Sequence, residues 1–187
     1  MSDAIPALAA AVQAALARGA PDEARDLCEY WLALAPNDAN AWLLSGIAAY
    51  RGNVPMSAIA ALQRSATLAS MAFQPRYWLG VAAMAAGDHA IAEKAFDDAL
   101  SLVPGHADAA YNLGVVLAKQ GRHDEAGRRF VAAGRASPKL GEAFQNVVEC
   151  AATLARAGRT APGARLSRCP AIRRSCRSSF AASMRRS

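Results

Sequence analysis

One repeating period runs through most of this 187-residue chain and constrains its fold more than any other feature. The dipeptide Leu79-Gly80 recurs one period later as Leu113-Gly114. The same offset aligns Gly87 with Gly121, His89 with His123, Ala92 with Ala126, Phe96 with Phe130, Ala99 with Ala133 and Pro104 with Pro138. Four ungapped units result, residues 5–38, 39–72, 73–106 and 107–140. The chain is therefore expected to stack copies of one small unit.

Each unit is expected to contain two helices. Trp42, Gly46 and Ala49 have helical spacing, and the first helix should end near a Gly or Asn that adopts positive φ. Pro21 and Pro55 stand where a second helix would begin, because the N–H that proline lacks is not needed there. The prolines expected to end second helices are Pro36, Pro104 and Pro138. Small residues should let the two backbones approach closely: Gly46, Gly80 and Gly114 on first helices, and Ala24, Ala58, Ala92 and Ala126 on second helices.

Charge and cysteine content exclude several classes of protein. The net charge of +6 comes from the Arg residues after Glu149, where no Asp or Glu occurs, and the chain through Glu149 is mildly acidic. A nucleic-acid partner is therefore disfavoured. The four cysteines, Cys28, Cys150, Cys169 and Cys176, show neither disulfide-framework nor zinc spacing, which favours a reducing compartment. No stretch predicts a membrane span, and Arg18 interrupts the apolar run from Ala4, so we expect a cytoplasmic protein.

These patterns resemble the tetratricopeptide repeat family. Unit 107–140 follows the family pattern most closely, with Asn112-Leu113-Gly114, Gly121, Ala126 and Pro138, and lacks only a large aromatic residue at Ala110. The first unit is the weakest, with Val12 where Gly is usual. The resemblance implies an all-α fold: a right-handed α-α superhelix, or solenoid, of four helical hairpins plus one further helix, with a disordered basic tail.

The array is expected to form one domain over residues 1–157, with a half unit at 141–157. Phe144, Val147, Val148, Ala151, Leu154 and Ala155 form the apolar stripe of that last helix. Residues 158–187 are rich in Arg and hold too few large apolar residues to offset the entropy of ordering, so they are expected to be disordered. The absence of acidic residues after Glu149 also suggests out-of-frame translation from about Gly158, against the alternative of a genuine basic arm.

No catalytic, cofactor or metal motif occurs, so we expect a non-enzyme without cofactors. His89, His106 and His123 are equally spaced, but their spacing is half the repeat period and places two at second-helix starts and one in a connector. Asp97-Asp98 is expected to be an exposed pair on a helix, and Cys28, in the slot of Phe96 and Phe130, a packing residue.

The resemblance implies that first helices line a concave groove for an extended peptide, with the second, fifth, sixth and ninth residues of each unit facing it. By position these are Asn40, Leu43, Leu44, Ile47, Gln74, Tyr77, Trp78, Val81, Asp108, Tyr111, Asn112, Val115, Gln145 and Asn146. For the aliphatic residues, support of adjacent helices is an equal alternative. Tyr77, Trp78 and Tyr111 are better candidates, because amphipathic aromatic side chains are enriched at binding surfaces.

The groove positions contain neither Lys nor Arg, which disfavours a clamp for acidic peptide tails. Asn112 and Asn146 resemble the asparagine ladder of repeats that feed O-linked N-acetylglucosamine transferases, although Leu44 and Trp78 interrupt it. The leading hypothesis is a scaffold that binds an extended, largely uncharged or aromatic-containing peptide. One alternative is the N-terminal recognition segment of a truncated glycosyltransferase, sulfotransferase or hydroxylase. A weaker one is that the Arg/Ser tail is an RNA-binding or kinase-regulated arm. The partner and the oligomeric state are left open.

Overall fold

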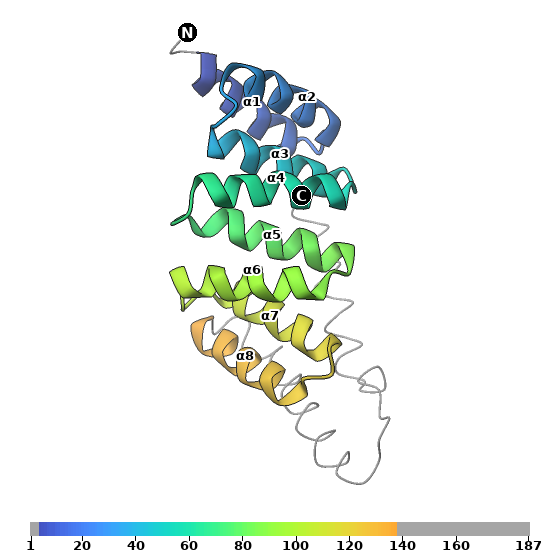
Figure 1. Ribbon diagram of the computed structural model, residues 1–187, viewed down its shortest axis with the longest axis vertical. Helices are drawn as coiled ribbons and strands as arrows, with labels where there is room; N and C mark the ends of the chain where they lie inside the picture. The colour runs from blue at the N-terminus through green and yellow to red at the C-terminus, as the bar shows by residue number, and fades with distance from the viewer. Residues whose placement is uncertain (1–3, 138–187) are drawn as a thin grey trace. The chain divides into compact units, whose positions relative to one another are not determined.

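The computed structural model describes residues 4–137, which form four consecutive helical hairpins (Figure 1). The first helices are α1 (Ala4–Ala17), α3 (Ala39–Arg51), α5 (Phe73–Ala86) and α7 (Ala107–Lys119). The second helices are α2 (Pro21–Leu34), α4 (Pro55–Leu68), α6 (His89–Leu102) and α8 (His123–Ala136), and their starts recur at the period of the sequence. The predicted all-α fold of hairpins is confirmed. The predicted half unit 141–157, with Gln145 and Asn146, and the tail 158–187 lie outside the described residues.

The turn between the two helices of each hairpin uses the left-handed backbone region. Gly19, Asn53, Gly87 and Gly121 have φ of 72°, 58°, 79° and 81°. Glycine enters this region without a steric penalty and Asn tolerates it, so the predicted helix ends are confirmed. Pro21 and Pro55 are the first residues of α2 and α4, also as predicted.

The interior of each hairpin after the first depends on one glycine of its first helix. A Cβ added to Gly80 would lie 2.6 Å from Cε1 of Phe96, and one on Gly114 would lie 2.7 Å from Cε1 of Phe130. The space beside Gly46 is similarly filled by Leu62, whose Cγ would lie 2.5 Å from a Cβ added to Gly46. Each of these glycines thus makes room for a large side chain of the second helix.

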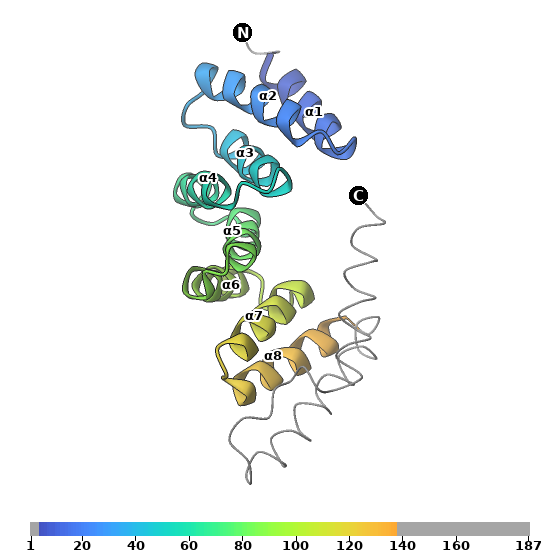
Figure 2. The same cartoon turned by 90° about the vertical axis from the view of Figure 1, so that its right-hand side faces the viewer.

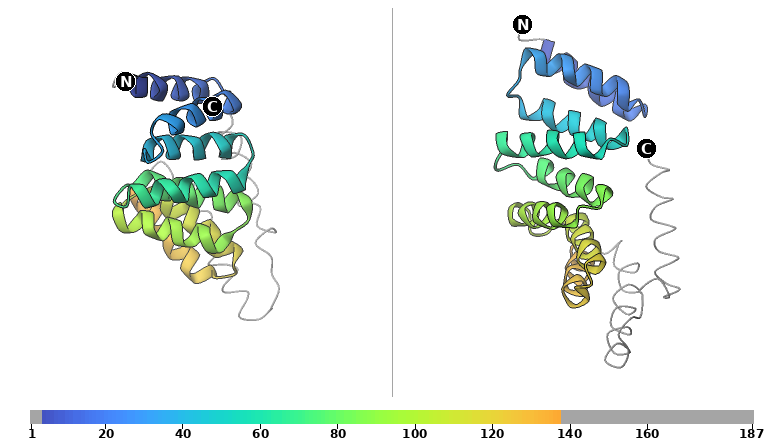
Figure 3. Two further views of the ribbon diagram at one scale, coloured as in Figure 1. Left: turned by 45° about the horizontal axis from the view of Figure 1, so that its top comes forward. Right: turned by 45° about the vertical axis from the view of Figure 1, so that its right-hand side comes forward.

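The chain divides into two compact units, Met1–Leu102 and Val103–Ser187, here called unit 1 and unit 2. In unit 1 each helix from α1 to α6 packs against the next, and first helices also contact each other, α1 with α3 and α3 with α5. Figure 2 shows α3 and α5 on one side of unit 1 and α4 and α6 on the other, and Figure 3 shows the same hairpins in two further views. In unit 2 the described helices α7 and α8 form one hairpin.

Candidate functional site

The first helices of unit 1 form the candidate site. Successive first helices of this unit contact each other, whereas no two of its described second helices do. Unit 1 therefore curves toward its first helices. The surface of α3 and α5 on this inner side is called the first-helix face below. Asn40 and Gln74 are exposed on it, and Leu43, Leu44, Tyr77 and Trp78 are half-buried.

Two of the predicted groove residues contribute little surface. Ile47 is 8% exposed and Val81 is 9% exposed, so both belong mainly to the packed interior. Leu43, Leu44 and Trp78 also pack against the buried cluster that contains Val12 and Trp31. These three side chains therefore support neighbouring helices and still present part of their surface.

A chain of aromatic rings crosses the first-helix face. The ring centroids of Phe73 and Tyr77 are 5.5 Å apart and stacked, and those of Tyr77 and Trp78 are 5.8 Å apart with an edge-on approach. The Trp78 ring then meets Tyr50 of α3 at 6.0 Å, with planes inclined by 55°. Tyr77 also lies 6.1 Å from Phe96, which anchors the chain of rings to the core of the α5–α6 hairpin.

The three tryptophans differ in what their indole N–H groups contact. Nε1 of Trp31 donates to Oδ2 of Asp38 at 3.2 Å, and Nε1 of Trp42 donates to the carbonyl of Pro36 at 2.9 Å. Nε1 of Trp78 has no hydrogen-bond partner within the described part of the chain. This nitrogen is also not fully buried. This donor is therefore accessible to a ligand or to water.

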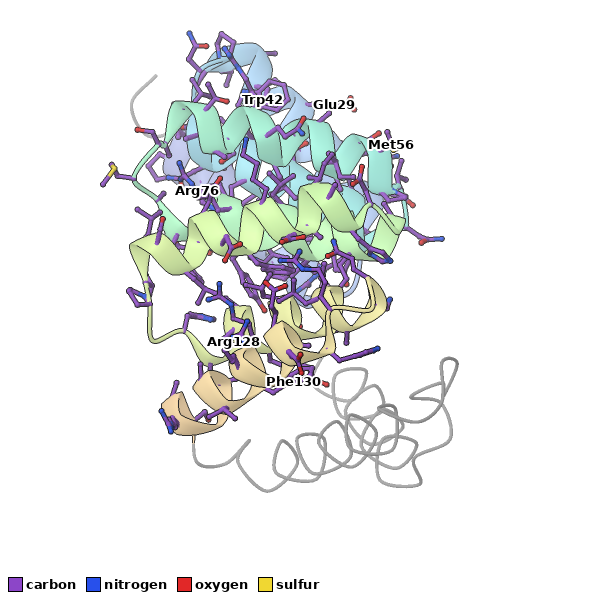
Figure 4. The ribbon with its side chains drawn as sticks, turned by 60° about the horizontal axis from the view of Figure 1, so that its bottom comes forward. Glu29, Trp42, Met56, Arg76, Arg128 and Phe130 are labelled. Carbon is purple, nitrogen blue, oxygen red and sulfur yellow. The ribbon has the colours of Figure 1, made fainter. Side chains whose placement is uncertain are left out.

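The first helices of unit 1 are almost uncharged. Arg51 and Arg76 are the only charged residues of α1, α3 and α5, whereas α2 alone carries Asp22, Glu23, Arg25, Asp26 and Glu29. Both guanidinium groups donate to backbone carbonyls, Arg51 to Leu16 at 2.8 Å and Arg76 to Ala72 at 3.0 Å. Figure 4 labels Arg76 on α5 and Glu29 on α2. Charge in unit 1 is thus concentrated on α2 and α6, whereas α4 carries only Arg64.

The remaining described groove candidates lie on α7 in unit 2. Asp108 is exposed, and Tyr111, Asn112 and Val115 are half-buried. The Tyr111 ring lies 5.5 Å from Phe130, the labelled aromatic side chain of α8 in Figure 4. This contact is the counterpart within unit 2 of the contact between Tyr77 and Phe96.

Sequence reasoning missed two residues of the first-helix face, Tyr50 and Phe73. Both stand outside the four positions that the family resemblance nominates in each unit. The sequence could have indicated Phe73, because this residue precedes Tyr77 by one helical turn and residues at that spacing are neighbours on a helix. Tyr50 and Trp78 belong to different hairpins and meet because α3 contacts α5, so no local signal could have paired them.

Other sequence candidates have structural roles. Nδ1 of His106 accepts a hydrogen bond from the backbone N–H of Ala109 at 3.2 Å and caps α7, while His89 and His123 begin α6 and α8. Asp97 and Asp98 are exposed on α6, as predicted. Cys28 is fully buried, as expected for a packing residue, and burial raises its pKa to about 12. No helix within residues 4–137 is long and apolar enough to cross a membrane.

Comparisons with known proteins agree with this architecture. A family model described as tetratricopeptide repeat matches residues 77–139. The crystal structure of MamA is similar, with a TM-score of 0.69, 25% identity, and coverage of 74% of this chain and 81% of that chain. The crystal structure of YrrB, described as a TPR protein with an unusual peptide-binding site, has a TM-score of 0.65, 26% identity, and coverage of 73% and 71%.

A mutant O-GlcNAc transferase from Thermobaculum terrenum also shares the fold. Its TM-score is 0.65 at 22% identity, and the match covers 70% of this chain but 26% of the enzyme. At this identity the likeness concerns the fold alone. No curated protein matches the chain in sequence.

Proposed function

Because this chain is a tetratricopeptide repeat protein, we propose that it is a protein-interaction scaffold without catalytic activity, which holds an extended, largely uncharged peptide on the first-helix face. The observation that carries the proposal is the near absence of charge on the first helices of unit 1, where Arg51 and Arg76 are the only charged residues. A face whose two guanidinium groups already bind backbone carbonyls offers no cluster of cations for an acidic tail. It also offers no carboxylate for a basic peptide.

The polar side chains of the face suit a peptide backbone. The exposed amides of Asn40 and Gln74 both donate and accept hydrogen bonds, and each bond contributes roughly 0.5 to 1.5 kcal/mol net. The half-buried rings of Tyr77 and Trp78 supply apolar contact area on α5. The peptide-binding site described for YrrB, a structure of the same fold, is consistent with this use of the array. In unit 2, Asp108, Tyr111, Asn112 and Val115 are proposed as binding residues of that unit, because they stand at the same positions of the repeat.

Peptides selected from a random display library against the protein provide the test. Replacing Trp78 by Ala should weaken the best peptide by about 2 kcal/mol, roughly 30-fold, because buried aromatic anchors dominate binding energy. The matched control is Tyr30→Ala, which removes an aromatic side chain that is 60% exposed on second helix α2. Tyr30→Ala should leave the affinity unchanged, and far-UV circular dichroism should be the same for both variants.

Two results would contradict the proposal. Equal loss of helicity and binding in Trp78→Ala would make Trp78 a core residue. Selection of peptides rich in Asp, Glu, Lys or Arg would contradict an uncharged ligand. The alternative, a recognition segment of a larger transferase, stays a prediction because the likeness to the O-GlcNAc transferase concerns the fold alone.

A further inference from the structure

The first-helix face repeats its side chains from α3 to α5. Asn40 and Gln74 are the second residues of these two helices, and Leu44 and Trp78 are the sixth. The two amides are exposed, and the Leu44 and Trp78 side chains are half-buried. Each helix therefore presents one amide and one large apolar side chain at the same register, and each such pair is called a subsite below.

The first helix α1 does not add a third subsite. Its equivalent residues, one repeat period before those of α3, are Pro6 and Ala10. Neither has a side-chain amide or a large apolar side chain. Within the described part of unit 1, the face thus offers two subsites, one on α3 and one on α5.

The distance between the two subsites follows from the packing of their helices. The helices α3 and α5 are in contact and lie on the same side of unit 1 (Figure 2). The axes of two helices that pack against each other are about 8 to 10 Å apart, so equivalent side chains of α3 and α5 recur at about this interval. A peptide that uses both subsites must present equivalent groups at the same interval.

The conformation of an extended peptide decides which of its residues meet this interval. In a β-strand, side chains on one face recur every two residues, at about 6.6 to 6.8 Å, which is too short. In the polyproline II conformation three residues complete one turn and advance about 9.3 Å, so residues i and i+3 point the same way at the required interval. This conformation is common in unfolded chains of ordinary composition and does not require proline.

The amides of the face suit the same backbone. A polyproline II segment makes no internal hydrogen bonds, so its N–H and C=O groups are free to bind a partner. The amides of Asn40 and Gln74 each donate and accept, and can therefore bind either group. Because they recur at the same interval as Leu44 and Trp78, they can bind backbone groups three residues apart.

On this basis, and resting on the proposed function, we propose that the first-helix face recognises an uncharged segment of a partner protein in the polyproline II conformation, with apolar side chains at positions i and i+3. One of these side chains contacts Leu44 and the other contacts Trp78. The face selects a period of three residues, and the identity of the residues between the two apolar positions matters less.

Three labelled peptides test this period by fluorescence anisotropy on the full chain. They have equal length and composition, contain only Ser, Ala and two Leu residues, and place the two Leu residues at i and i+2, at i and i+3, or at i and i+4. The i,i+3 peptide should bind about tenfold more tightly than the other two, because only this spacing buries both Leu side chains together. Amide couplings of the bound peptide should give φ of about −75° for the residues between the two Leu.

Substitutions at the subsites should remove this preference. In Leu44→Ala and in Trp78→Ala one apolar contact is lost, so the i,i+3 peptide should bind no more tightly than the other two. Since both side chains also pack against the buried cluster, the exposed residue Asn40 provides a variant that leaves the packing intact, and Asn40→Ala should weaken the i,i+3 peptide most. The matched control is Met56→Ala, which removes a side chain that is 72% exposed on second helix α4 (labelled in Figure 4) and should leave the preference unchanged.

The outcomes separate this inference from the proposed function. If the three peptides bind equally, or if the i,i+2 or the i,i+4 peptide binds most tightly, the three-residue period is refuted and peptide binding stands. The period is refuted in the same way if Met56→Ala and Asn40→Ala change the preference equally. If none of the three peptides and no peptide from the display library binds, both proposals fail.

Discussion

At the scale of single residues, the hairpins are built on matched volumes at two facing positions, one on each helix. In three hairpins a glycine faces a large side chain: Gly46 with Leu62, Gly80 with Phe96, and Gly114 with Phe130. In the first hairpin the corresponding positions hold Val12 and Cys28, both fully buried in one cluster. The residue that departs from the family pattern, Val12, is thus compensated by a smaller residue opposite, which keeps the interior filled.

Two glycine substitutions test this packing. Gly80→Ala should destabilise the protein by roughly 1 to 3 kcal/mol, because its Cβ would lie 2.6 Å from the Phe96 ring. Gly127→Ala on α8 is the matched control, since no heavy atom lies within 4 Å of its added Cβ, and it should stabilise the protein by roughly 0.5 to 1 kcal/mol. Urea denaturation followed by circular dichroism measures both. A Gly80→Ala variant as stable as the wild type would contradict the tight contact.

Burial of Cys28 predicts a thiol that reports on unfolding. Its pKa is raised from 9.0 to about 12 by desolvation, so about one thiol in ten thousand is ionised at pH 8 in the folded state. In a variant with Cys150, Cys169 and Cys176 replaced by Ser, reaction with Ellman's reagent should be slow and should accelerate with urea in step with unfolding. Because the unfolded thiol ionises at lower pH, stability should also fall as the pH rises from 9 toward 12. Rapid labelling of the folded variant at pH 8 would contradict the burial of Cys28.

At the scale of elements, the first helices α3, α5 and α7 differ in their N-cap residues. Asp38 accepts from the backbone N–H groups of Asn40 and Ala41 at 2.8 and 3.4 Å, and His106 caps α7 through Nδ1. Ala72 occupies the same position before α5 with an extended backbone, φ of −92° and ψ of 134°, and has no side chain to cap with. The helix that carries Tyr77 and Trp78 thus begins without a side-chain cap.

Ala72→Asp should add that cap. The backbone of Ala72 already has the conformation of an N-cap residue, so the substitution should stabilise the protein by about 1 kcal/mol. Asp38→Ala is the reciprocal control and should destabilise by about 1 kcal/mol or more, because it also removes the acceptor of the Trp31 indole N–H. Thermal unfolding of both variants provides the measurement. A lower melting temperature for Ala72→Asp would contradict the assigned N-cap.

At the scale of the whole molecule, each hairpin of unit 1 completes the interior of its neighbour. Ala41, Ile47 and Ala48 of α3 belong to the same buried cluster as Val12 and Trp31 of the first hairpin. Arg51 of α3 also donates to the carbonyl of Leu16 at the end of α1. In an array of this kind stability depends on such neighbour contacts, and no single central core exists.

Deletion of residues 1–38 should therefore destabilise the array without abolishing the later hairpins. The shortened chain should keep its helicity per residue at low temperature, unfold at a lower temperature, and bind the dye ANS more strongly because Ile47 and Ala48 lose their cover. Circular dichroism and dye fluorescence measure these changes. Complete loss of helicity would contradict the neighbour-contact description.

The sequence by itself determined the helix boundaries and their register. Turn glycines, the helix-starting prolines Pro21 and Pro55, and small residues such as Ala92 recur at one period, and each acts within a few residues of its own position. For this reason the second helices start where the period predicts. The all-α hairpin fold follows from the same local signals.

The tertiary structure alone decided which side chains meet between helices. It places Leu62 against Gly46, brings Tyr50 to Trp78, and buries Ser65 so that its hydroxyl donates to the carbonyl of Ala39 at 2.7 Å. It also left the indole N–H of Trp78 without a partner within the described residues, while Trp31 and Trp42 have theirs. The physical reason is that a repeat pattern records the period of the backbone, whereas contacts between helices depend on the volumes and directions of side chains that lie far apart in the sequence.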